Sequence, residues 1–226
     1  MTTTEPTYPL APQGVFWTVQ GEGSLAGEPM VFVRLAGCPV GCPECDTDYA
    51  VHSRVGLDEL VRLVAACDPT PGRWVWLTGG EPTAHDLPPL CARLHRYGYR
   101  VAVATAGVKP VRLGSARVYD HGPAFLSVSP HFADARWVQR SGDQVNLVPG
   151  LNGLKLGDFE GIDFGGFNYR YVTPLWYAPS DRAERVAECV EWVRRHKGWR
   201  LGCQSHKAWG VARGSWCRGA RKPRSG

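Results

Sequence analysis

The sequence predicts an α/β protein with a mainly parallel sheet. Short apolar runs rich in β-branched residues alternate with segments whose apolar residues follow helical spacing, and glycine or proline closes most runs. Strands and helices that alternate in this way form parallel sheets, whose functional loops lie at the carboxyl ends of the strands. The chain has no internal repeat, and its 226 residues suit one domain.

The N-terminal part is expected to begin with a flexible leader over residues 1–14, because prolines and polar residues occur there without periodicity. The run 31–35 predicts a strand that ends in a loop rich in glycine and proline. A helix is expected from Leu57, and the next strand, over 75–77, stops at Gly79.

The rest of the chain is expected to contain a helix around Leu90, several strands, and a long amphipathic helix that begins near Ser180 and ends at Gly198. The expected strands cover residues 99–105, 116–119, 125–128, 154–156, 169–172 and 199–204. Residues 15–209 are then a single domain, and residues 210–226 form a tail.

This tail is basic and is expected to be disordered. It contains five positively charged residues and no acidic residue, while the formal net charge of the whole chain is +5. The remainder is therefore neutral, and we do not expect nucleic acid as a partner. No apolar run approaches the roughly 18 residues that a membrane span requires, and the first residues do not form a signal peptide pattern. These features predict a cytoplasmic protein without a membrane partner.

Three cysteines, Cys38, Cys42 and Cys45, lie close together on the loop after the strand 31–35. Iron-sulfur clusters are normally held by four protein thiolates, so a set of three leaves one iron open to a ligand that is not a protein side chain. Zinc is the alternative, because the three thiolates and His52 can form a tetrahedral structural site. The spacing alone favours neither interpretation.

A second motif, Thr78-Gly79-Gly80-Glu81-Pro82, follows the strand 75–77 directly. Glycines there allow backbone groups to approach a ligand closely, and the carboxylate can meet an ammonium group. A cysteine loop after one core strand and Gly-Gly-Glu-Pro after the next is the layout of radical S-adenosylmethionine (SAM) enzymes, which this chain resembles. The resemblance implies a partial TIM-like barrel of about six parallel strands with reduced helices. It also implies a 4Fe-4S cluster on the cysteines, with SAM on its fourth iron.

Within this superfamily the sequence resembles the 7-carboxy-7-deazaguanine synthases over residues 16–207. The motifs that carry the resemblance are Gln20-Gly21-Glu22-Gly23, Phe32-Val33-Arg34-Leu35, Cys45-Asp46-Thr47, Ser129-Pro130, Leu154-Lys155 and Gln204-Ser205-His206-Lys207. They imply a lyase of 7-deazapurine (queuosine) biosynthesis that contracts the ring of 6-carboxy-5,6,7,8-tetrahydropterin to 7-carboxy-7-deazaguanine and releases ammonia. A radical is needed because the hydrogen on the substrate ring carbon is not acidic enough for a side-chain base.

The resemblance also implies roles for individual residues. The expected substrate contacts are Val19, Gln20, Gly21, Glu22, Arg34 and Thr78. The planar guanidinium of Arg34 suits the substrate carboxylate, and Thr47 is the expected ligand of Mg²⁺, a cation that keeps several waters. The expected SAM-binding residues are Gly80, Glu81, Thr105, Ser129, Pro130, His131, Thr173, Pro174, Leu175 and Trp176.

The chain departs from the family pattern on the SAM side. Ala104-Thr105-Ala106-Gly107 stands where relatives have Glu-Thr-Asn-Gly, His131 replaces a lysine, and Glu44 stands where an aromatic residue is common. Each lost hydrogen bond is expected to cost about 0.5–3 kcal/mol. We therefore expect an unchanged substrate class with a divergent cofactor pocket.

Relatives imply a homodimer and a reductant such as a flavodoxin as partners. Two other functions remain open at this stage. One is a glycyl-radical activating enzyme, which shares the cysteines but acts on a large protein partner. The other is a zinc-binding adaptor that holds nucleic acid with its basic tail, and its binding is expected to fall steeply with salt.

Overall fold

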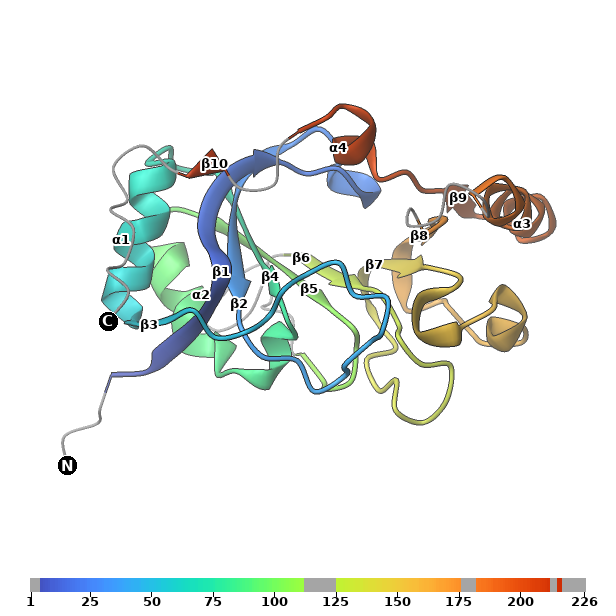
Figure 1. The fold of residues 1–226 in the computed structure, drawn as a ribbon, viewed down its shortest axis with the longest axis horizontal. Helices are drawn as coiled ribbons and strands as arrows, with labels where there is room; N and C mark the ends of the chain where they lie inside the picture. The colour runs from blue at the N-terminus through green and yellow to red at the C-terminus, as the bar shows by residue number, and fades with distance from the viewer. Residues whose placement is uncertain (1–4, 112–124, 176–181, 212–214, 217–226) are drawn as a thin grey trace.

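The computed structural model describes residues 5–111, 125–175, 182–211 and 215–216. They form one mixed ten-stranded sheet in the order β10-β1-β2-β4-β5-β6-β7-β8-β9, with β3 paired to β1 outside this path (Figure 1). The strands are β1 Thr7–Val19, β2 Pro29–Leu35, β3 Ser53–Gly56, β4 Trp74–Gly79, β5 Arg100–Thr105, β6 Phe125–Val128, β7 Gly142–Leu147, β8 Phe167–Val172, β9 Trp199–Leu201 and β10 Ser215–Trp216. The α-helices are α1 Leu57–Cys67, α2 Leu87–Arg96, α3 Arg182–Arg195 and α4 Ser205–Ala208, and short 3-10 helices cover Gly23–Leu25, Pro82–Ala84, Leu151–Gly153 and Leu156–Phe159.

The strands from β2 to β9 along this path run parallel and form the curved centre of the fold, as Figure 1 shows. β1 lies antiparallel to β2, while β3 and β10 lie antiparallel to β1. The sheet is open, because its end strands β9 and β10 do not pair with each other. The predicted α/β class is confirmed, but the described residues form seven parallel strands where about six were expected.

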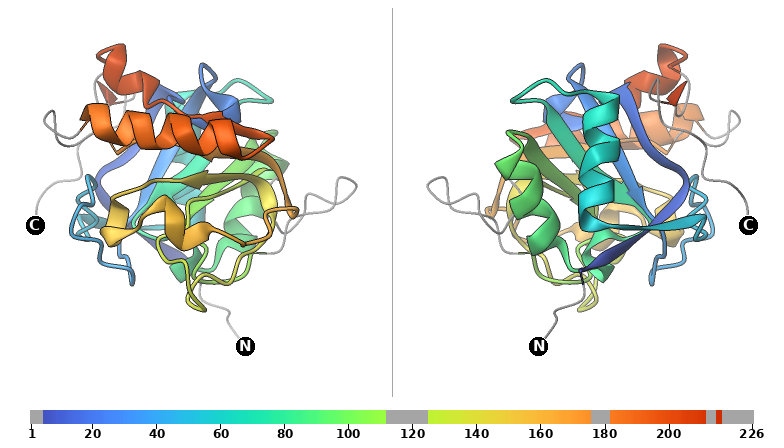
Figure 2. Two further views of the ribbon diagram at one scale, coloured as in Figure 1. Left: turned by 90° about the vertical axis from the view of Figure 1, so that its right-hand side faces the viewer. Right: turned by 90° about the vertical axis from the view of Figure 1, so that its left-hand side faces the viewer.

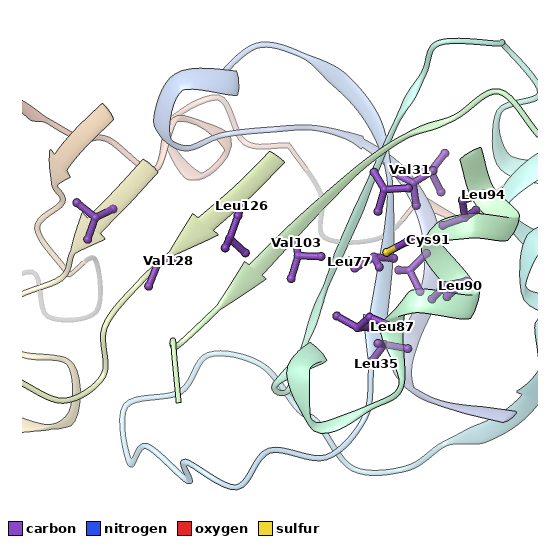
Figure 3. Close-up of a cluster of buried hydrophobic side chains, with 14 of the residues drawn as sticks. Val31, Leu35, Leu77, Leu87, Leu90, Cys91, Leu94, Val103, Leu126 and Val128 are labelled. Atoms are coloured by element: carbon purple, nitrogen blue, oxygen red, sulfur yellow. The ribbon is translucent and has the colours of Figure 1, made fainter. Parts of the chain in front are cut away.

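The main hydrophobic core lies between the sheet and helices α1 and α2, which Figure 2 shows side by side on its outer face. The buried residues of α2 follow helical spacing and are Leu87, Leu90, Cys91 and Leu94. They face Val31, Leu77 and Val103 of the sheet (Figure 3). This core leaves the opposite face of the sheet to the polar and aromatic side chains of the site.

Most predicted elements are confirmed. The runs 31–35, 75–77, 99–105, 125–128 and 169–172 correspond to β2, β4, β5, β6 and β8, and the run 199–204 begins as β9 but leaves the sheet after Leu201. The three predicted helices correspond to α1, α2 and α3. No helix in the described part of the chain is long and apolar enough to cross a membrane. The expected strand at 116–119 and the helix start near Ser180 lie outside the described residues.

The first half of β1 falls inside the predicted flexible leader 1–14, so that prediction is wrong from Thr7 onward. Tyr8 and Leu10 are buried, and this part of β1 pairs with β3. The register of β1 against β2 shifts after Leu10, and Pro12 lies in this irregular stretch, where it need not donate a ladder hydrogen bond. Pairing with two neighbouring strands therefore orders a segment that shows no strand periodicity.

Strand β7 is missing from the sequence-based prediction, and the strand expected over 154–156 is wrong. Residues 151–159 form two 3-10 turns instead. In β7, Gln144 and Asn146 are buried amides that alternate with apolar residues of the core. Polar residues at two of the five buried positions weakened the apolar pattern on which the prediction depended.

Part of the basic tail is ordered. Ser215 and Trp216 form β10, which pairs antiparallel with Phe16 and Trp17 of β1. The prediction of a disordered tail over 210–226 is therefore wrong for these two residues, and most of the remaining tail lies outside the described residues.

Candidate active site

A pocket of about 210 Å³ lies toward the carboxyl ends of the parallel strands. All six predicted substrate-binding residues line it: Val19, Gln20, Gly21, Glu22, Arg34 and Thr78. They come from β1 and the loop after it, from β2 and from β4, which are neighbours in the sheet. Arg34 and Thr78 are direct partners in the parallel pairing of β2 with β4. The fold thus brings together motifs that are far apart in the sequence.

Aromatic side chains of three neighbouring strands form one wall of this pocket: Phe16, Phe32 and Trp76. The ring centroids of Phe16 and Phe32 lie 5.5 Å apart, and those of Phe32 and Trp76 lie 6.2 Å apart. The guanidinium carbon of Arg34 lies 5.6 Å from the centre of the Phe16 ring, within the range of a cation–π contact. A wall of aromatic rings suits a flat ligand.

The loop after β1 is held in shape by its own glutamine. The Gln20 Oε1 accepts hydrogen bonds from the backbone N–H of Gly21 at 2.9 Å and of Glu22 at 3.1 Å. Gly21 leaves room for His206 of α4, because a Cβ at position 21 would lie 2.1 Å from Nδ1 of His206. The N–H of Ser205 also donates to the Gly21 carbonyl at 2.9 Å. The C-terminal motif therefore packs directly on the predicted substrate loop.

Polar contacts continue from this loop to α4 and back to the cysteine loop. Gln204 Nε2 donates to Glu22 Oε1 at 2.8 Å, and Lys207 Nζ donates to Gln204 Oε1 at 2.8 Å. Lys207 Nζ also lies 3.3 Å from Asp46 Oδ2. Burial raises the pKa of Glu22 above its ordinary value near 4.5, and the hydrogen bond from Gln204 offsets only part of this effect. Gln204 and Lys207 therefore orient the two carboxylates of the pocket.

Arg34 joins the same network through Thr47. Its Nη1 donates to the Thr47 hydroxyl at 2.9 Å, and that hydroxyl donates to Asp46 Oδ1 at 3.4 Å. A guanidinium suits a ligand carboxylate, and the adjacent hydroxyl and carboxylate oxygens suit a hard cation. Asp46 was not among the predicted site residues, although it directly follows a cluster cysteine.

Strand β7 supplies a polar wall of the pocket that the sequence analysis missed. Gln144 Nε2 donates to Ser127 Oγ at 2.8 Å, and its Oε1 accepts from the Ser24 N–H at 2.9 Å. Asn146 Oδ1 accepts from the Thr173 hydroxyl at 2.6 Å. Both amides line the pocket. Their alternation with apolar residues is the signal that could have revealed this strand.

A second pocket of about 250 Å³ adjoins the first and is lined by the three motif cysteines, Cys38, Cys42 and Cys45. The residues that line both pockets are Glu22, Asp46, Thr47, Thr78, Ala104, Ser129, Asn146 and Gln204. Burial raises the pKa of the Cys42 thiol to about 11 and also raises that of Cys45. Metal binding must therefore displace thiol protons.

The donor set of this second pocket fits a cluster better than a single zinc ion. His52, which a zinc site would need, is exposed and does not line the pocket. Within the described residues, no three side chains of His, Cys, Asp or Glu lie close enough together to hold a single metal ion. A four-iron cluster is larger and holds its thiolates farther apart, and three cysteines on one wall leave its fourth iron open to the pocket.

Gly80 packs against the start of the cysteine loop. A Cβ at position 80 would lie 1.9 Å from the backbone oxygen of Gly37. The Gly80 N–H donates to the Leu35 carbonyl at 2.8 Å, and the Glu81 N–H donates to the Gly37 carbonyl at 2.9 Å. The glycine motif thus positions the cysteine loop, in addition to lining the second pocket.

The Glu81 carboxylate connects the end of β4 with β5. The sequence analysis expected it to meet an ammonium group, but in the structure it accepts hydrogen bonds from neighbouring residues. Its Oε1 accepts from the hydroxyls of Thr83 and Thr105, each at 2.7 Å. Its Oε2 accepts from the Ala106 N–H at 2.7 Å. The residue is 2% exposed, so these donors satisfy the oxygens of a buried carboxyl group.

Only some of the predicted SAM-binding residues line the second pocket. Those that line the second pocket are Gly80, Glu81, Thr105, Ser129, His131 and Leu175. Pro130 and Thr173 are buried outside this lining, and Pro174 does not line it either. Trp176 lies outside the described residues.

Comparison with known proteins decides the family. No family model matches the chain. The 7-carboxy-7-deazaguanine synthase of Burkholderia multivorans is 33% identical over 212 residues, which cover 85% of this chain and 94% of that protein. The chain belongs to the 7-carboxy-7-deazaguanine synthase family. The synthase of Synechocystis sp. is 32% identical over 215 residues, which cover 91% of this chain and 94% of the relative.

The fold agrees with that of another 7-carboxy-7-deazaguanine synthase family member. A crystal structure of QueE from Escherichia coli superimposes with a TM-score of 0.64 at 23% identity, and the match covers 87% of this chain and 93% of that one. The family resemblance seen in the sequence is confirmed by the two relatives above, and this structure shows the same fold. It supports neither the glycyl-radical activating enzyme nor the zinc-binding adaptor.

The residues that the sequence analysis expects to depart from the family pattern lie around the cysteine pocket. Ala104 lines both pockets, while Glu44, Ala106 and His131 line the second. His131 is half-buried, and desolvation lowers its pKa to about 4. Its ring is therefore neutral near pH 7.

The raised pKa of Glu22 predicts a pH-dependent effect of Glu22→Gln. Above about pH 4.5 the unfolded chain releases this proton before the folded protein does, so the free energy of unfolding of the wild type falls as pH rises toward the folded pKa. Glutamine does not titrate and can still accept from Gln204. We expect Glu22→Gln to gain stability relative to wild type across this window.

Urea unfolding between about pH 4 and pH 8 measures this difference. Glu59→Gln, at an exposed position on α1, is the control for the loss of a carboxylate. A difference between Glu22→Gln and wild type that stays constant with pH would contradict the prediction.

Proposed function

We propose that this protein is a radical SAM lyase that contracts the ring of 6-carboxy-5,6,7,8-tetrahydropterin to 7-carboxy-7-deazaguanine, with release of ammonia, in 7-deazapurine (queuosine-type) biosynthesis. The relatives named above carry the name of this enzyme. The observation that carries the proposal is the shared wall between the pocket of the predicted substrate residues and the pocket of the three cysteines. A ring bound in the first pocket lies next to a group bound in the second, and such proximity lowers the barrier to reaction.

Cys38, Cys42 and Cys45 would hold the 4Fe-4S cluster, and residues around Gly80 and Ser129 would bind SAM. When bound, the cluster and SAM supply the 5'-deoxyadenosyl radical that removes the hydrogen from the substrate ring. The residues of the first pocket would hold the ring in one orientation beside that site.

Each wall of the first pocket suits one part of the substrate. The guanidinium of Arg34 binds the carboxylate, with Thr47 as a ligand of Mg²⁺ and Asp46 beside it. The aromatic wall packs on the flat part of the pterin. The carboxylate of Glu22 and the backbone of the loop after β1 bind the amino and amide edge.

The same proposal includes a homodimer, a cytoplasmic location, and a reductant such as a flavodoxin that delivers the electron to the cluster. These three features rest on the family alone. Size-exclusion chromatography with light scattering tests the dimer, and SAM cleavage with reduced flavodoxin tests the electron donor.

The decisive experiment is anaerobic reconstitution with iron and sulfide, followed by reduction and incubation with SAM, Mg²⁺ and 6-carboxy-5,6,7,8-tetrahydropterin. We expect mass spectrometry to detect 7-carboxy-7-deazaguanine, and we expect less product when Mg²⁺ is removed with a chelator. A brown protein that cleaves SAM without forming this product would overturn the proposed substrate. A colourless protein that binds only zinc would overturn the radical mechanism.

A further inference from the structure

Two of the residues expected to depart from the family pattern, Glu44 and His131, are joined through Asn152. The backbone N–H of Asn152 donates to Glu44 Oε2 at 2.9 Å, and its side-chain Nδ2 donates to the His131 carbonyl at 3.0 Å. Glu44 lies on the cysteine loop, His131 follows β6, and Asn152 lies in the 3-10 turn after β7. One residue, through its backbone N–H and its side chain, therefore ties His131 to the loop that carries the motif cysteines.

The ring of His131 reaches one of these cysteines. Its Nδ1 lies 3.1 Å from Cys42 Sγ. A cysteine that ligates a cluster is a thiolate, which can only accept a hydrogen bond, so a contact of this kind places the hydrogen on Nδ1. Both side chains line the second pocket, and Cys42 is the most buried of the three cysteines.

The turn that holds His131 has a defined backbone. Asn152 adopts a left-handed conformation with φ 53°, and Gly150 before it has φ 92°. Arg185 of α3 fixes this turn from outside, since its Nη1 donates to the Pro149 carbonyl at 3.3 Å. The backbone of His131 is therefore held by the turn after β7, which Arg185 of α3 fixes from outside.

We propose that His131 is a positioning residue that donates a hydrogen bond from Nδ1 to the thiolate of Cys42 and thereby raises the reduction potential of the cluster. Asn152 holds His131 in place and, through Glu44, holds the cysteine loop against it. The physical reason is that the reduced cluster carries more negative charge on its sulfurs, so a donor to one of them stabilises the reduced form more than the oxidised form. This inference rests on the proposed function, because it requires the cluster.

Redox titration of the reconstituted full-length protein, followed by the electron paramagnetic resonance signal of the reduced cluster, tests this proposal. His131→Leu removes the Nδ1 donor and replaces the imidazole ring with an apolar side chain of similar size. His131→Asn retains an amide N–H near the place of Nδ1. We expect a more negative midpoint potential in His131→Leu and a potential close to that of wild type in His131→Asn. Iron and sulfide analysis confirms that each variant carries a full cluster.

An unchanged potential in His131→Leu, or an equal shift in both His131 variants, would overturn the proposal. If His131→Leu assembles no cluster, the midpoint potential of Asn152→Gly tests the proposal instead. Glycine adopts the left-handed backbone of position 152 without strain, so this substitution removes only the hydrogen bond from the Asn152 side chain to the His131 carbonyl. A smaller negative shift in Asn152→Gly supports the proposal, and an unchanged potential contradicts it. A protein that shows these shifts but forms no carboxydeazaguanine would instead overturn the proposed function alone.

Discussion

Gly80→Ala is expected to remove most of the capacity of the protein to assemble its cluster. The new Cβ would lie 1.9 Å from the oxygen and 2.5 Å from the carbon of the Gly37 peptide. Both are backbone atoms, so no side chain can turn away, and either the end of β4 or the start of the cysteine loop must shift. Overpacking of a well-packed site typically costs about 1–3 kcal/mol. Because Cys38 directly follows Gly37, we expect the displacement to fall on the cluster ligands.

Iron and sulfide content, with visible absorption after reconstitution, measures this effect, and thermal unfolding measures any general loss of stability. Two glycines provide matched controls. A Cβ at Gly157 meets nothing within 4 Å, so Gly157→Ala should leave the cluster intact. Gly41 lies on the cysteine loop with φ 65° and also has open space, so Gly41→Ala adds backbone strain without the clash. Full cluster content in Gly80→Ala would contradict the role assigned to Gly80.

Arg34→Ala is expected to lower kcat/KM for the carboxytetrahydropterin by about 10- to 150-fold, because hydrogen bonds between charged groups contribute about 1.5–3 kcal/mol. Arg34 lines the first pocket, lies near the ring of Phe16, and donates to Thr47. Arg34→Lys keeps the charge but loses the planar fork, so its loss should be intermediate. Steady-state kinetics with saturating SAM and reductant measures both variants.

Cluster content and SAM cleavage without substrate separate this effect from damage to the cofactor pocket, since Arg34 does not line the second pocket. Arg62→Ala, at an exposed position on α1, is the control for loss of a surface charge. Undiminished kcat/KM in Arg34→Ala would exclude Arg34 as the partner of the substrate carboxylate.

Sequence reasoning was most successful where a motif is local. The three cysteines, the Gly79-Gly80 pair and the loop after β1 each lie within a few residues, and each directly follows a strand. A short motif at the end of a parallel strand reaches the same edge of the sheet as the others, and these segments line two adjoining pockets. The predicted substrate residues therefore lie together in the fold.

Sequence reasoning was less successful where neighbouring strands decide the structure. Strand β1 contains prolines and is ordered by pairing with β2 and β3. The buried amides of β7 disrupt an apolar pattern, yet each is satisfied by a hydroxyl or N–H from another segment. Such partners are unknown until the strand order is known, because hydrogen bonds between distant segments leave no periodic signal.

The sequence by itself determined the α/β class, the cysteine loop, the family and six of the residues that line the first pocket, because these depend on local spacing and on motifs in a fixed order. Only the tertiary structure decided that Glu81 joins β4 to β5, that Gly21 makes room for His206, and that His131 contacts Cys42. These contacts join residues separated by 24 to 185 positions. Their geometry depends on how the curved sheet orders its strands and on where each loop crosses its edge.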